Sequence, residues 1–276
     1  MVVVLELAGV RKEFQRADGS VRSVLRNVVM QVPAGRVLVL LGENGCGKTT
    51  LLRIIDGSVP CDAGTVRVNG VDISAWPQFR RAGQVTMVGQ AREASLAQSL
   101  TVEENLLVAT ARTHQWIGSL RDGRSRRAVD AALTRADGRL APLRTSQVRS
   151  LSGGEHQLLA VMLAAHIVAQ LGVAGTAFLL DEHVAHLDPD AAGLVLDFTR
   201  ACVIEFQLAC VLVTHDLETA IRIGDRVAVM AGGVIAGESE ISGLRARDAR
   251  ELVAAMWRRV RAPSTVPESA HEGESA

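Results

Sequence analysis

A segment of small and polar residues could bind the phosphates of a nucleotide. Residues 42–50 read GENGCGKTT; the apolar run 37–41 before them predicts a buried strand, and residues 49–55 predict a helix start. Glycines there let backbone N–H groups face phosphate oxygens, and a helix start attracts anions. The lysine suits β- and γ-phosphates, and the next hydroxyl suits Mg²⁺. We therefore expect a nucleotide to contact Gly42, Asn44, Gly45, Cys46, Gly47, Lys48, Thr49 and Thr50, with Thr49 also on Mg²⁺.

A second segment ends in two adjacent carboxylates. Residues 176–182 read TAFLLDE, and an apolar strand would carry the acids to its carboxyl end, where α/β folds bind ligands. Since neighbouring residues of an extended chain point in different directions, Asp181 could hold Mg²⁺ while Glu182 orients and deprotonates an attacking water. Many strands end at a charged pair, so this segment indicates a nucleotide site only in combination with the glycine-rich loop.

A third segment could present a hydroxyl and bare amides to a phosphate. Residues 151–155 read LSGGE, which we call the LSGGE segment, and Ser152, Gly153 and Gly154 stand at a predicted helix start. Taken alone, the segment is also compatible with an ordinary helix N-cap.

Strands and helices must bring these three segments together. Apolar runs predict strands within residues 2–40 and at 64–71, 178–180 and 210–213, and helix-like stretches alternate with the later ones. This alternation predicts an α/β fold with a parallel sheet. Residues 91–150 have helical spacing, which indicates an inserted helical subdomain. Residues 262–276 are rich in Pro, Ser, Glu and Ala and predict a disordered tail.

The order of the three segments resembles that of the ABC ATPase family, over about residues 3–260. The resemblance implies a P-loop NTPase cassette within residues 1–261. Its parts would be a mixed sheet core, an N-terminal antiparallel β subdomain and a helical subdomain at about 91–160. A narrower resemblance, through DEHVAHLDP, is to ATPase subunits of bacterial uptake systems linked to aromatic amino acids or related small solutes. Members of this subgroup end in a helix, which the resemblance implies at 248–261 here.

The family resemblance assigns further residues. Phe14 stands where the family stacks an aromatic ring on adenine, although an ordinary core aromatic would fit the sequence as well. Gln90 matches the glutamine that senses Mg²⁺ and the attacking water, and His215 matches the histidine that contacts the γ-phosphate. His183 replaces the usual proline after Asp-Glu. With His186 it makes a pair without a third metal ligand, so we expect both histidines at an interface or in solvent.

Composition and charge exclude some classes of protein. The formal net charge of zero argues against a protein whose main task is to grip nucleic acid. Residues 156–180 lack charged side chains and could span a membrane by length, but polar and glycine interruptions favour a buried helix followed by a buried strand. Nine arginines stand against three acids in residues 112–149, which indicates a solvated helix face or a docking surface for a partner or anionic lipid.

The resemblance implies the ATP-hydrolysing subunit of an ABC transporter that uses ATP and Mg²⁺. Two copies would face head to tail, bound to integral membrane permease subunits at the cytoplasmic face of the plasma membrane. Import of a small solute is expected, with an extracytoplasmic solute-binding protein as an indirect partner and no nucleic acid. A soluble ABC ATPase of DNA repair or translation, and a regulatory module without turnover, are the alternatives.

Overall fold

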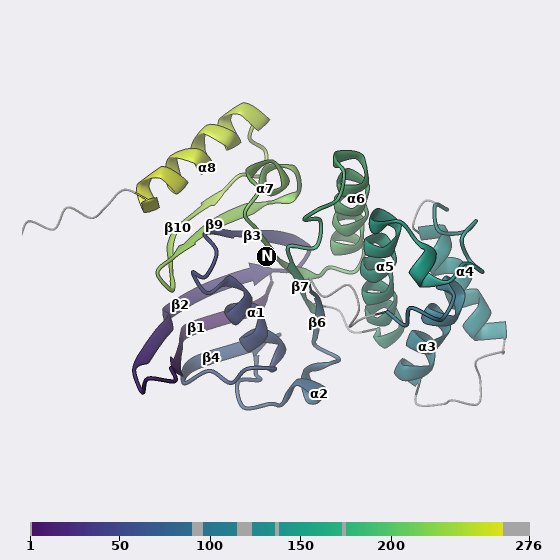
Figure 1. Ribbon diagram of the computed structural model, residues 1–276, viewed down its shortest axis with the longest axis horizontal. Coiled ribbons are helices and arrows are strands. Elements are labelled where there is room, and N and C mark those ends of the chain that lie inside the picture. Colours follow the sequence, from purple (N-terminus) through teal and green to yellow (C-terminus); the bar gives the residue numbers. More distant parts are fainter. Residues whose placement is uncertain (1, 90–95, 115–122, 136–137, 173–174, 262–276) are drawn as a thin grey trace, which may run out of the picture.

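The computed structural model describes residues 2–89, 96–114, 123–135, 138–172 and 175–261. Two sheets lie side by side, and most helices gather at the mixed sheet and beyond it (Figure 1). This arrangement is the predicted α/β class.

The first sheet is antiparallel and is built mainly from the N-terminal part of the chain. Its strand order is β2-β1-β4-β5. The strands are β1 (Val3–Gln15), β2 (Val21–Pro33), β4 (Ala63–Val68) and β5 (Val71–Asp72). Leu5, Leu7 and Val10 of β1 are buried, because this face of the sheet packs on the core. The predicted N-terminal antiparallel subdomain is confirmed.

The second sheet is mixed and positions the carboxylates. Its order is β10-β9-β3-β8-β7-β6, with only the β9–β10 pair antiparallel. The strands are β3 (Arg36–Gly42), β6 (Val85–Val88), β7 (Ala177–Asp181), β8 (Ala209–Thr214), β9 (Arg226–Ala231) and β10 (Val234–Glu240). Strands β7 and β8 are buried along their whole length, as expected for parallel strands covered on both faces. Because β3 and β7 run parallel on either side of β8, their carboxyl ends reach the same edge.

Helices cover the mixed sheet and form an end of the molecule away from the first sheet (Figure 1). They are α1 (Lys48–Asp56), α2 (Gln78–Arg81), α3 (Val102–His114), α4 (Gly123–Arg135), α5 (Gly153–Leu171), α6 (Pro189–Glu205), α7 (Leu217–Ile223) and α8 (Ala246–Arg261). The subdomain boundary expected near residue 160 falls inside α5, so that division stays a prediction. The tail at 262–276 lies outside the described residues.

The apolar stretch 156–180 divides between α5 and β7, as predicted. Within the described ranges, none of the helices has the length and apolarity needed to span a membrane.

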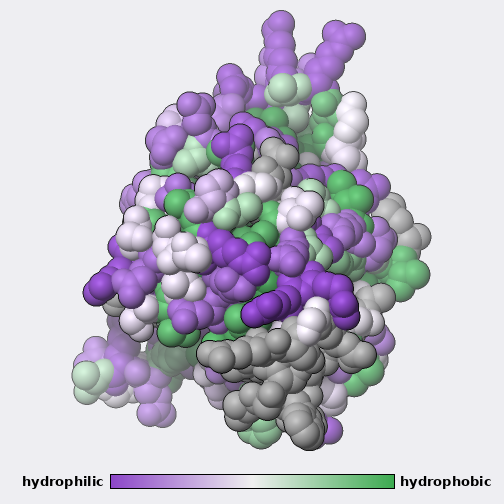
Figure 2. Space-filling model, turned by 90° about the vertical axis from the view of Figure 1, so that its right-hand side faces the viewer, coloured by the Kyte–Doolittle hydropathy of each residue, from purple (hydrophilic) through white to green (hydrophobic). Residues whose placement is uncertain are grey.

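The arginine-rich region lies at the end formed by α3, α4 and α5. Hydrophilic residues prevail on the described part of this face (Figure 2). Arg144 pairs with Glu103 and Asp130, at 2.6 Å in each case, and Arg135 pairs with Glu205. These ion pairs neutralise part of the positive charge of the arginine-rich region. Both earlier interpretations of the region, a solvated face and a docking surface, stay open.

Arg81 secures the C-terminal end of α1. Its side chain is buried, and its Nη1 donates to the carbonyls of Ile54 at 2.7 Å and Ile55 at 2.9 Å. Two further donors reach the carbonyls of Ser74 and Trp76. The guanidinium therefore satisfies carbonyls that the helix end leaves without partners.

Arg81→Met is expected to lower the free energy of unfolding by about 3 kcal/mol, because several buried carbonyls lose a charged donor. Urea denaturation measures the change. The exposed neighbour Arg80, which stacks on Trp76 at 4.3 Å, provides the control, and Arg80→Met should cost less than about 1 kcal/mol. Equal losses for both variants would contradict this role of Arg81.

Asp225 joins β3, α6 and β9 at the opposite edge of the mixed sheet. Its buried carboxylate accepts from Arg200 Nη2 at 2.8 Å, from Arg36 Nη1 at 2.9 Å and from the Val37 amide at 2.8 Å. Burial raises the pKa of Asp225, but the hydrogen bonds from Arg200 and Val37 outweigh it, and the pKa lies below its ordinary value.

A carboxyl group with a lowered pKa stabilises the fold above its unfolded-state pKa, about 4, and this contribution is lost as pH falls through the folded-state pKa. Asp225→Asn should therefore lower the free energy of unfolding by about 2–3 kcal/mol at pH 7. The difference from the wild type should shrink below about pH 4, which urea unfolding at several pH values measures. A difference independent of pH would contradict the ionic contribution.

Candidate nucleotide-binding site

The loop between β3 and α1 is folded around its lysine. Lys48 is 6% exposed, and its Nζ donates to the carbonyls of Gly42 at 2.7 Å and Glu43 at 2.9 Å. Gly47 has a φ of 113°, and a Cβ there would meet Leu25 Cδ2 at 2.8 Å, so the position requires glycine. The third N–H group of the ammonium meets only the weak acceptor Cys46 Sγ, at 4.0 Å, and a phosphate oxygen could replace this contact.

Asp181 ends β7 beside this loop. It is 5% exposed, and its Oδ1 has no hydrogen-bond partner within the described residues. Burial raises the pKa of Asp181, and the nearby Thr49 hydroxyl opposes the rise. Thr49 of the glycine-rich loop therefore lies close to the acidic segment. The two segments therefore meet at one edge of the sheet.

Glu182 has an unusual backbone that separates it from Asp181. Its φ is 47°, a left-handed value that non-glycine residues seldom adopt and that is often found at functional sites. Its Oε1 lies 3.1 Å from Nδ1 of His215, which follows β8. The turn thus sets Glu182 toward the cavity while Asp181 stays buried.

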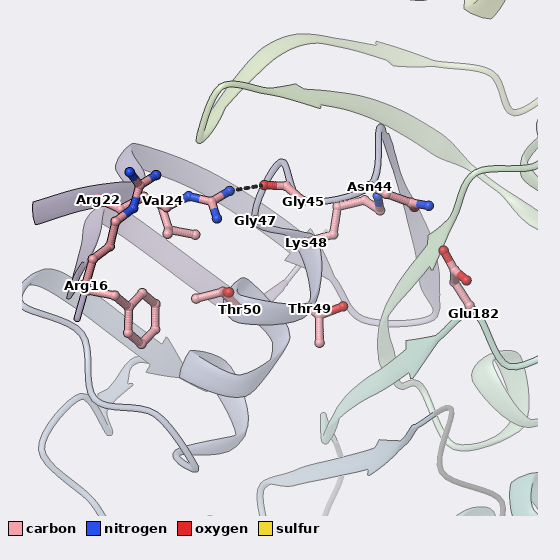
Figure 3. Close-up of a pocket in the computed structure, with 11 residues that line it drawn as sticks. Arg16, Arg22, Val24, Asn44, Gly45, Gly47, Lys48, Thr49, Thr50 and Glu182 are labelled. Carbon is pink, nitrogen blue, oxygen red and sulfur yellow. Dashed lines mark hydrogen bonds between the residues drawn. The ribbon is translucent and has the colours of Figure 1, made fainter. Parts of the chain in front are cut away.

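A cavity of about 650 Å³ joins the loop to the antiparallel sheet (Figure 3). Its lining consists of Phe14, Arg16, Arg22, Val24, Asn44, Gly45, Gly47, Lys48, Thr49, Thr50 and Glu182. Phe14 is 41% exposed and is therefore not a core aromatic, which removes the alternative left open by the sequence. Sequence reasoning missed Arg16, Arg22 and Val24, because only the pairing of β1 with β2 brings them to the loop. Only their position shortly after Phe14 in the sequence could have indicated that they line the cavity.

The oxygen atoms near Asp181 fit a magnesium ion. A buried, unpaired carboxylate oxygen beside a threonine hydroxyl belongs to the ligand type that Mg²⁺ prefers, with phosphate oxygens completing its shell. Among the described residues no group of three or more His, Cys, Asp or Glu side chains could hold a metal ion. The described side chains of these types therefore form a magnesium site only together with phosphate oxygens.

The LSGGE segment does not reach this cavity. Ser152 caps α5 through a capping box, in which its Oγ accepts from the Glu155 amide and Glu155 accepts from the Ser152 amide. A Cβ at Gly154 would lie 2.7 Å from Ala191 Cβ, so the glycine permits α5 to approach α6 closely. The described lining of the cavity does not include Ser152, Gly153 or Gly154. In Figure 1, α1 and α5 lie on opposite sides of β7.

The remaining expected positions differ in outcome. Gln90 lies outside the described residues. Cys46 is half-buried, with its Sγ 4.0 Å from Lys48 Nζ. The expectation for His183 is wrong, because its side chain is 3% exposed and both ring nitrogens lack partners in the described part of the chain. Burial lowers the pKa of His183 to about 3, which keeps the ring neutral. His186 is exposed, as expected.

A family model described as ABC transporter matches residues 25–184, more than half of the chain. The chain belongs to the ABC transporter family. As a member of this family it binds and hydrolyses ATP. The cavity beside Lys48 is therefore the candidate ATP site of an ABC ATPase.

Relatives of this ABC ATPase include subunits of named transport systems. A hemin import ATP-binding protein of Pseudomonas entomophila is 37% identical over 213 residues, covering 76% of this chain and 78% of that protein. A tyrosine transport ATP-binding protein of Clostridioides difficile is 27% identical over 237 residues, covering 84% and 90%. An ATP-binding cassette solved as a dimer with ADP and phosphate has a TM-score of 0.70 at 21% identity, covering 87% of this chain and all of that one. This last likeness supports the cassette fold.

Proposed function

We propose that this ATPase works as a head-to-tail dimer that drives import of a small solute through separate membrane permease subunits. The main support for a dimer is that the LSGGE segment lies away from the cavity of its own chain. Amides and a hydroxyl at a helix start suit a phosphate, yet within the described chain these groups do not line the cavity of the phosphate-binding loop. A second copy turned head to tail would supply one.

Within each cavity the proposed roles follow from position and charge. The amides of residues 42–49 and the Lys48 ammonium bind the β- and γ-phosphates. The Phe14 ring stacks on the base, because it is exposed and lines the cavity from β1 of the antiparallel sheet. Glu182 accepts a proton from the attacking water, and His215 holds the Glu182 carboxylate in place and contacts the γ-phosphate.

Asp181, Thr49 and Gln90 are proposed to hold Mg²⁺. The ion supplies positive charge against the charge that develops on the phosphates. Asp181 must be ionised for this role although burial favours its neutral form, so a neighbouring cation is needed to keep the proton off.

The transport role is proposed from the relatives. Both curated relatives reported above are named for transport, one of hemin and one of tyrosine. We infer an importer bound at the cytoplasmic face of the plasma membrane and served indirectly by an extracytoplasmic solute-binding protein. The tyrosine relative and the DEHVAHLDP segment both favour an aromatic amino acid or a related small solute.

Isolation of the native complex tests the proposal. A tagged chain purified from detergent-solubilised membranes should bring down an integral membrane protein in comparable amount, and this complex should hydrolyse ATP. Recovery of nucleic acid or ribosomes without an integral membrane protein would favour a soluble ABC ATPase and contradict the transport role. A complex that binds ATP without turnover would favour the regulatory alternative.

A further inference from the structure

Two arginines line the end of the ATP cavity that the antiparallel sheet provides. Arg16 follows β1 and Arg22 lies near the start of β2, and both side chains line the cavity (Figure 3), as Phe14 does. Arg22 Nη2 donates to the carbonyl of Gly45 at 3.4 Å, which ties it to the glycine-rich loop. Neither arginine belongs to the expected family positions.

Their positive charge is not neutralised by the protein. In the described part of the chain, no carboxylate lies within ion-pairing distance of Arg16 or Arg22, whereas Arg36 and Arg200 both pair with Asp225. The acid of the same turn, Asp18, accepts instead from the amide and hydroxyl of Ser20, at 2.8 and 2.6 Å. The two guanidinium groups therefore present surplus positive charge to an open cavity.

The position of this charge indicates which part of a nucleotide it meets. Lys48 and Thr49 line the cavity from the start of α1, where we place the β- and γ-phosphates, and Phe14 lines it from β1, where we place the base. The α-phosphate is the anionic group between them, and Arg22 spans the same interval because it reaches from β2 to the Gly45 carbonyl. Guanidinium groups form strong charge-assisted hydrogen bonds with phosphate oxygens.

We propose that Arg16 and Arg22 form a second anion-binding element of the cavity, which holds the α-phosphate of the nucleotide. The inference rests on the proposed placement of the nucleotide between Lys48 and Phe14. The two arginines would contact the α-phosphate, which both AMP and ATP have. Lys48 would contact the β- and γ-phosphates, which AMP lacks. Affinity for AMP should therefore exceed affinity for adenosine.

Glutamine substitutions test this inference, because glutamine retains a donor for the Gly45 carbonyl but carries no charge. Displacement of a fluorescent ATP analogue gives the affinities of ATP, ADP, AMP and adenosine. The double variant Arg16→Gln/Arg22→Gln should bind ATP and ADP about tenfold more weakly than the wild type, with kcat within about twofold. AMP and adenosine should then compete at similar concentrations. Added salt should weaken ATP binding less than in the wild type.

Arg26→Gln is the matched control, since Arg26 is exposed on β2 but does not line the cavity. If the double variant binds every nucleotide like Arg26→Gln while Lys48→Ala has lost ATP binding, the second anion site is rejected and the proposed placement stands. A fall in kcat with unchanged affinities would also reject it, because the arginines would then only position the loop. Retained ATP binding in Lys48→Ala would overturn the placement itself.

Discussion

Glu182→Gln is expected to lower the ATP turnover number by about 10²- to 10³-fold, because glutamine cannot accept the proton of the attacking water. The change keeps the size of the side chain and its position beside His215. A phosphate-release assay at saturating ATP measures the turnover number. Affinity for ATP should change little, since the phosphate-binding groups of residues 42–49 are untouched.

The same variant should accumulate as an ATP-bound dimer, because binding still closes two copies while hydrolysis no longer separates them. Size-exclusion chromatography with and without ATP detects that dimer. Glu205→Gln removes a carboxylate from α6 that pairs with Arg135, and it should behave like the wild type in both assays. Turnover by Glu182→Gln equal to that of the wild type would remove Glu182 from its proposed role.

Lys48→Ala is expected to weaken ATP binding at least tenfold and to reduce turnover at least 10²-fold. The ammonium lies at the phosphate end of the cavity and also holds the carbonyls of Gly42 and Glu43, so its loss removes charge and loosens the loop. Titration of a fluorescent ATP analogue gives the affinity.

Thermal unfolding of Lys48→Ala separates loss of binding from loss of fold, because an intact transition with weak ATP binding assigns the effect to the site. Arg26→Ala, on an exposed part of β2, should retain both affinity and turnover. An affinity of Lys48→Ala within twofold of the wild type would contradict the proposed phosphate site.

The elements that place the site could be predicted from the sequence because local rules and burial agree there. Apolar runs define β3, β7 and β8, which are buried throughout or nearly so, and the glycine-rich loop follows the first of them. Parallel pairing then brings the ends of β3 and β7 to one edge, which places Asp181 beside Thr49. The last helix was expected at 248–261 from the resemblance to the uptake-system subgroup, within two residues of the start of α8.

Features that depend on long-range packing could not be predicted. Arg16 and Arg22 join the site only through the hairpin of β1 and β2, and nothing in their own neighbourhood marks them as ligand contacts. His183 follows the left-handed turn at Glu182 and is buried by packing around it, whereas the lack of a third metal ligand had suggested an interface or solvent. The separation of the LSGGE segment from the cavity likewise depends on where α5 packs.

The central claim is that each ATP lies between the glycine-rich loop of one copy and the LSGGE segment of the other. Lys48→Ala removes the ammonium from the glycine-rich loop. Gly153→Asp places a negative charge where the partner's phosphate would bind, but an acid at the start of α5 should not destabilise that helix. Each variant alone should be nearly inactive. In an equal mixture, half of the dimers would contain one intact site, so turnover should recover toward about a quarter of the wild-type rate for a symmetric dimer. A mixture no more active than its separate components would contradict the shared site.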